Sequence, residues 1–124
     1  MTTPGRATPR RAARTWATVT AAAGAVTVFR PQAVARLVSG TGPTPDTPVV
    51  RILGGRQLLQ GTAVMIRPTQ ALVTGAAVVD VLHATSMIAA ALIWPRYRRA
   101  ALGSAAVAGA SAAAGALVLR GARR

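Results

Sequence analysis

The feature that most constrains this chain is a series of long apolar segments interrupted only by short arginine-containing stretches. The clearest is residues 100–119, which contain no charge, and residues 70–94 form a second long apolar run. A helix of about 20 apolar residues crosses the hydrocarbon layer of a bilayer, which is ~30 Å thick. The pattern therefore predicts membrane-spanning helices.

Two further segments complete the pattern. Residues 15–29 are uncharged, and residues 49–66 are mostly apolar, with Arg51 near their start and Arg56, Gln57 and Gln60 near their middle. Between them, residues 30–40 contain Pro31 and apolar residues at helical spacing, which predicts a short helix in the membrane interface. We therefore predict an all-α integral membrane four-helix bundle with this short helix between spans one and two.

The predicted boundaries follow from these runs. The spans cover about residues 15–29, 49–66, 70–94 and 100–119, and together form one membrane domain, 15–119. Residues 1–14 are rich in Pro, Thr and Arg and are predicted to be a disordered basic tail, and residues 120–124 a second basic tail.

A cleaved signal peptide is the alternative interpretation of residues 15–29. Arg10, Arg11 and Arg14 would form its basic region, and residues 21–23 would form its cleavage site. The apolar run continues past those alanines without a polar region, which favours a retained helix.

The composition agrees with lipid as the solvent. Charged residues make up 14% of the chain, compared with roughly 25% in soluble domains. All fifteen basic residues are Arg, and twelve of them gather between the apolar runs, at residues 6–14, 30–36, 96–99 and 120–124. Nucleic-acid binders gather basic residues on one face, whereas flanking charges are typical of membrane spans. We predict the bilayer as the partner, no nucleic acid, and a location in the cell membrane.

Four spans would place both termini on one side of the membrane. The arginines at 6–14, at position 67 and at 120–124 favour the cytoplasm for that side, whereas those at 96–99 oppose it. We predict cytoplasmic termini.

The residue types exclude several kinds of chemistry. The chain has no Cys and a single His, which rules out disulfides, thiolate chemistry and sites that need two imidazoles from one chain. No metal or cofactor is predicted. No nucleophile with a base and an orienting group is recognisable, so a non-catalytic protein is favoured over an enzyme.

Arg56 lies in the middle of the second predicted span. It is twelve positions before Pro68, and Asp80 is twelve positions after it. If spans two and three form a hairpin that turns at Pro68, both side chains lie ~18 Å from the turn, near mid-membrane. Each charge alone costs at least ~2.5–3.5 kcal/mol at that depth. The equal offset predicts that Arg56 and Asp80 contact each other.

Other polar residues extend this pair into a predicted intramembrane polar cluster. Gln60 is one helical turn from Arg56, and His83 is three residues after Asp80. The predicted cluster comprises Arg56, Gln60, Asp80 and His83, with Arg51 and Ser86 at its edge. One interpretation is structural, an ion pair that fixes the register of two helices. The other is functional, a site for a proton, an anion or a small polar ligand.

Residues 100–119 carry small side chains at helical spacing. Ala101, Ala105, Gly109 and Ala113 form a stripe, and Ser111 with Gly115 forms a second close pair. Such stripes let helices approach closely in lipid, which predicts a homo-oligomer or a membrane partner on this span. The alternative is that an Ala-rich composition produces the spacing by chance.

Three short motifs resemble landmarks of small four-span bacterial membrane proteins, the DoxX-like group in its broad sense. They are RILGGRQLLQG (51–61), VVDVLHATSM (78–87) and PRYRRAAL (95–102). The resemblance covers roughly residues 49–105 and implies a four-helix membrane bundle with an Arg early in a core span. Some members of the group are associated with quinone-linked sulfur or thiol oxidation. That activity is not carried over, because no Cys and no catalytic residue set map onto this chain.

Three functions are consistent with these features. The first is a structural or accessory membrane protein that acts through partners. The second is a small transporter or proton-coupled pathway that uses Arg56, Asp80 and His83. The third, an accessory subunit of a membrane redox enzyme, rests on analogy of fold alone.

Overall fold

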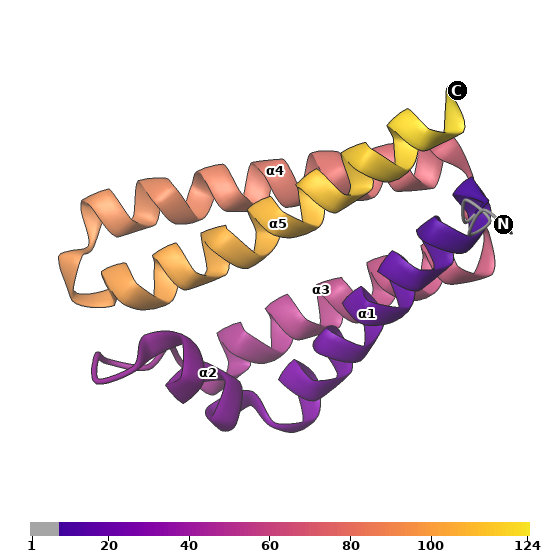
Figure 1. Ribbon diagram of the computed structural model, residues 1–124. Helices are drawn as coiled ribbons and strands as arrows, with labels where there is room; N and C mark the ends of the chain where they lie inside the picture. The colour runs from indigo at the N-terminus through magenta and orange to yellow at the C-terminus, as the bar shows by residue number, and fades with distance from the viewer. Residues whose placement is uncertain (1–7) are drawn as a thin grey trace, which may run out of the picture.

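The computed structural model describes residues 8–124, and every regular element in that range is helical (Figure 1). The elements, in chain order, are α1 (Pro9–Phe29), α2 (Pro31–Ser39), α3 (Thr47–Ile66), α4 (Gln70–Ile93), the 3₁₀ helix η1 (Pro95–Tyr97) and α5 (Arg98–Ala122). The predicted all-α class is confirmed, and so is a short helix at the predicted place between the first two long ones.

The long helices form two pairs. Helix α1 packs along α3, and α4 packs along α5, so that the pairs lie as two layers (Figure 1). Helices α3 and α4 follow each other in the chain, yet they touch far less than the members of either pair. The start of α1 and the end of α5 lie at the same end of the molecule, here called the terminal end (Figure 1).

Proline and capping residues set the helix boundaries. Pro31 occupies the first turn of α2, where its missing N–H is not needed. Gly40 ends that helix with a φ of 57°, in the left-handed region that favours glycine. At the start of α4, the Thr69 side chain accepts a hydrogen bond of 3.3 Å from the Leu72 amide. The predicted tight connection between the second and third long helices is thus present.

The two basic segments differ from the prediction. Residues 1–7 of the expected tail lie outside the described residues, but the chain is helical from Pro9 onward. The reason is that Ala13 packs into the hydrophobic core, with only 2% of its surface exposed. At the other end, α5 continues to Ala122, so most of the segment 120–124 extends the last helix.

Glycine lets α1 and α3 approach closely. A Cβ added at Gly61 would lie 2.5 Å from the amide nitrogen of Ala21 and 2.7 Å from the carbonyl oxygen of Ala17. Gly24 and Gly54 face each other farther along the same contact, and a Cβ at Gly24 would lie 2.7 Å from the Gly54 carbonyl oxygen. Close backbone approach of this kind is how helices gain packing energy when neither partner carries large side chains.

The hydrophobic core lies at the terminal end, where the two pairs meet. The core residues are small, so the helices come close together and the core fills little volume. Trp16 packs against this core, and its ring lies 3.6 Å from where a Cβ on Gly115 of α5 would be. The buried members of the core are Ala13, Ala17, Val64, Val73 and Ala76.

Two helical segments are long and apolar enough to cross a membrane. They are Gln70–Ile93 and Pro95–Ala122, with mean hydropathies of 1.9 and 1.7. The mean hydropathy of helices α1 and α3 is lower than that of these two segments. The hydropathy therefore supports two of the four predicted spans. In α3 the cause is the polar group in its middle, which includes Arg56 and Gln60.

Gly61→Ala should destabilise the α1–α3 contact, because the added methyl group meets backbone atoms that cannot move independently. We expect a loss of about 1–3 kcal/mol in the free energy of unfolding, measured by denaturant titration in mixed micelles. Gly55→Ala on the same helix is the matched control, since a Cβ there meets nothing within 4 Å. That variant should be neutral or slightly more stable, because alanine favours the helix. Equal losses in both variants would contradict the close contact.

Candidate functional site

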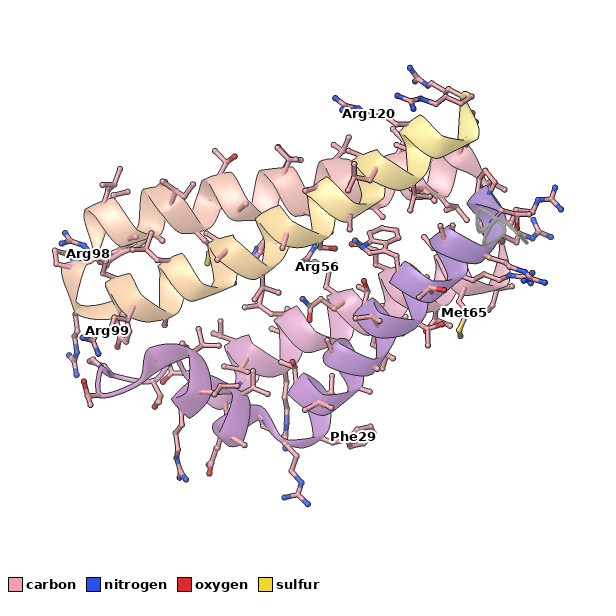
Figure 2. The ribbon with its side chains drawn as sticks, in the orientation of Figure 1. Phe29, Arg56, Met65, Arg98, Arg99 and Arg120 are labelled. Atoms are coloured by element: carbon pink, nitrogen blue, oxygen red, sulfur yellow. The ribbon has the colours of Figure 1, made fainter. Side chains whose placement is uncertain are left out.

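The centre of the candidate site is an ion pair between α3 and α4. Arg56 Nη1 lies 3.2 Å from Asp80 Oδ1, and the side chains are 25% and 3% exposed. Figure 2 shows Arg56 in the middle of the molecule, between the two layers of helices. The contact predicted from the equal distances to Pro68 is therefore present.

Gln60 completes a polar triad with this pair. Its Nε2 donates to Asp80 Oδ1 at 3.3 Å and to the Ala76 carbonyl oxygen at 3.2 Å, and its Oε1 accepts from Arg56 Nη1 at 3.4 Å. The geometry follows from helical periodicity, because Arg56 and Gln60 are one turn apart on α3 and Ala76 and Asp80 one turn apart on α4. The triad joins two helices that otherwise touch little.

Part of the hydrogen-bonding capacity of the triad is unused. Arg56 Nε and Asp80 Oδ2 are buried and have no hydrogen-bond partner in the described chain. All the hydrogen bonds found for the guanidinium use Nη1. A buried polar atom without a partner is costly, so these two atoms add to the cost of burying the pair.

His83 faces α5 and pairs with a residue that the sequence did not identify. Its Nε2 lies 2.9 Å from Ser104 Oγ. Ser104 stands in the predicted fourth span, and no spacing rule relates it to His83. The available signal was a hydroxyl in an Ala-rich helix, which is too common to single out one residue.

The remaining two predicted residues lie apart from the cluster. The Ser86 hydroxyl is exposed and donates to the Leu82 carbonyl oxygen of its own helix, at 2.8 Å. Arg51 is exposed and borders a different hollow. Periodicity explains both outcomes: at 3.6 residues per turn, Ser86 is rotated far from the face of Asp80, and Arg51 far from the face of Arg56. Neither Arg51 nor Ser86 therefore lies at the edge of the cluster, contrary to the prediction.

A hollow of about 380 Å³ adjoins the triad. Residues of α1, α2, α3 and α5 form most of its walls, and α4 contributes His83. Most of the lining is aliphatic, and the polar residues on it are Thr27, whose hydroxyl donates to the Ala23 carbonyl oxygen, and Arg56, Gln57, His83 and Ser104. An apolar hollow of this size with a few convergent polar groups has the general form of a small-molecule site.

The arrangement lacks the parts of a hydrolytic or metal centre. The Ser104–His83 contact resembles a nucleophile beside its base, but a third group that would orient the imidazole is missing among its described hydrogen bonds. The carboxylate nearest in sequence, Asp80, is engaged by Arg56 and Gln60. In residues 8–124, no three His, Asp or Glu side chains gather as a metal site.

Comparison of this chain with protein families, with curated proteins and with solved structures finds no match. The assignment of a role therefore depends on the geometry alone.

Asp80→Leu should strongly destabilise the protein, because it leaves the Arg56 charge without its partner. We expect the free energy of unfolding in mixed micelles to fall by about 3–5 kcal/mol. The double variant Arg56→Met/Asp80→Leu removes both charges and should recover most of that loss, since two apolar side chains need no polar partner.

Arg51→Met is the matched control for this pair of variants, because it removes an exposed Arg of the same helix. It should change the free energy of unfolding by less than about 0.5 kcal/mol. A double variant as unstable as Asp80→Leu alone would show that the loss does not come from the unpaired Arg56 charge.

Proposed function

We propose that the chain is an integral membrane protein that crosses the bilayer four times, with a structural or accessory role. In this proposal the Arg56–Gln60–Asp80 triad holds the α1–α3 pair against the α4–α5 pair. The triad supports the proposal most directly, because it encloses the charges that would otherwise keep α3 out of lipid.

The outer surface supports immersion of all four long helices. Large apolar side chains are exposed along each of them, and include Val19 on α1, Leu59 on α3, Leu82 on α4 and Leu117 on α5. Their exposed fractions are 64%, 75%, 63% and 67%. Monomeric soluble proteins rarely expose apolar surface this extensively, whereas a lipid-facing surface requires it.

The polar side chains of α1 are also compatible with lipid. The hydroxyls of Thr15, Thr18, Thr20 and Thr27 each donate to the carbonyl oxygen four residues earlier, at 2.8–3.0 Å. A hydroxyl bonded in this way needs no water. The residues that lower the hydropathy of α1 therefore carry a smaller cost in the membrane than their polarity suggests.

The distribution of arginines gives the proposed boundaries of the membrane. Figure 2 shows Arg120 at the terminal end and Arg98 and Arg99 at the opposite end. The connection at 67–69 lies at the terminal end, and the one at 94–97 at the opposite end, because the helices alternate in direction. We assign the terminal end to the cytoplasm, since it carries the described arginines of both terminal segments and Arg67.

Helix α5 is proposed to offer a surface to a partner or to a second copy of the chain. Ala101 and Ala105 of the small-residue stripe are buried within the protein, which leaves Gly109 and Ala113 exposed. A Cβ added at Gly109 would meet nothing within 4 Å. The partner surface in residues 100–119 is thus proposed to lie on the exposed half of the stripe.

A transport role is the second candidate, and the hollow beside Arg56 and His83 favours it. A channel would also need continuity to both membrane faces. A redox accessory role and the DoxX-like resemblance stay predictions from the sequence.

Single-cysteine labelling tests the number of spans. Because the chain has no native Cys, only the introduced cysteine can react. Thr44→Cys and Tyr97→Cys should react with a membrane-impermeant maleimide on the outer side of spheroplasts. Gln70→Cys and Gly121→Cys should react only after permeabilisation. The four-span topology places the connections before α3 and after α4 on one side, opposite the α3–α4 connection and the end of α5.

The outcome separates four spans from two. If α4 and α5 alone cross the bilayer, Thr44→Cys and Gln70→Cys react on the same side, which would contradict the proposal. Opposite sides with the reverse polarity would keep the four spans and overturn only the assignment of the termini to the cytoplasm.

A further inference from the structure

The hollow beside the triad has a polar wall and an apolar body. Aliphatic side chains that include Val26, Val34, Leu53 and Val107 surround most of it. Its volume of about 380 Å³ falls at the lower end of the range for small-molecule sites. A ligand that fits it is small and largely aliphatic.

The polar wall offers hydrogen-bond donors. Arg56 lines the hollow, and its described hydrogen bonds use Nη1, so the two N–H groups of Nη2 have no partner in the described chain. The His83–Ser104 contact also retains a donor in either imidazole tautomer. When His83 Nε2–H donates, the Ser104 O–H is free, and when Ser104 donates, His83 Nδ1–H is free. The complementary ligand group is therefore an acceptor oxygen.

Charge balance indicates that this acceptor is uncharged. Asp80 already neutralises Arg56 at 3.2 Å, and no acidic residue lines the hollow. A carboxylate bound there would leave a net negative charge in a poorly solvated interior, which is costly. A carbonyl accepts from Arg56 without changing the net charge.

We propose that this hollow binds an uncharged acyl compound, such as a fatty-acid ester, with its carbonyl oxygen on Arg56 and its chain along α1, α2 and α5. The site differs from the structural role of the triad, because it uses the donors that the triad leaves free. The binding proposal does not depend on the number of spans. Failure of the labelling experiment would overturn the four-span proposal, whereas failure of binding would overturn only the ligand proposal.

The test is equilibrium binding of tritiated methyl decanoate to the full chain in phosphatidylcholine nanodiscs, with empty nanodiscs subtracted. Unlabelled competitors are compared by their mole fraction in the lipid. Methyl decanoate should displace the label about tenfold or more better than decane, which has the same apolar chain without the carbonyl. Decanoate, at a pH where it is ionised, should compete more weakly than the ester.

Val107 is 52% exposed and lines the hollow, so Val107→Trp should narrow it and lower the affinity about tenfold. Leu117→Trp, at an exposed site on the same helix that does not line the hollow, should leave the affinity unchanged. If Val107→Trp fails to accumulate, Val34→Trp narrows the same hollow from α2.

Three results would overturn the proposal. Equal competition by decane would show that the hollow takes up any apolar chain. Preference for decanoate would show an anion site. Equal weakening by Leu117→Trp would show that the label binds the outer surface.

Discussion

The pairing of Arg56 with Asp80 is the interaction on which the rest of the structure depends. Each charge alone would be costly inside an apolar assembly, and each is made tolerable by the other at 3.2 Å. Gln60 adds a hydrogen bond to the same carboxylate oxygen and one to the backbone of α4. A rotation or a shift of α3 against α4 would break all of these contacts together, so the triad specifies a single register for the two layers.

Two kinds of contact hold the helices together, one within each pair and one between the pairs. Within the pairs, Gly and Ala allow close backbone approach, as at Gly61 and Ala21, and this packing is non-polar. Between the pairs, the small-residue core closes the terminal end, and the triad joins the layers near mid-helix. Beyond the triad, the hollow lies between the layers and is open on one side, and Arg56, His83 and Ser104 contribute to its polar wall. The structural and ligand-binding interpretations of Arg56 are thus compatible, because they use different atoms.

Much of the helix layout could be predicted from the sequence, since charges and prolines mark where apolar runs end. The Arg56–Asp80 contact could be predicted because depth along two antiparallel helices follows from residue counts alone. Rotation about each helix axis does not follow from counts, and for that reason Ser86 and Arg51 were placed wrongly. The pairing of α1 with α3, and the Ser104 partner of His83, join helices distant in sequence, and single-chain periodicity carries no information about such contacts. The helical start at Pro9 was missed because its composition is typical of a tail, whereas packing of Ala13 decides the outcome.

The most direct test of the central claim is the distance between the guanidinium and carboxylate groups in a bilayer. Solid-state NMR of lipid-reconstituted protein, with ¹⁵N in the Arg side chains and ¹³C in the Asp carboxyls, resolves the question because the chain has only two aspartates. The Asp80 carboxyl signal should lose intensity rapidly through dipolar coupling to nitrogen, as a 3.2 Å N–O contact requires, while exposed Asp46, which has no ion pair within the described chain, should not. Equal and slow loss for both aspartates would contradict the account.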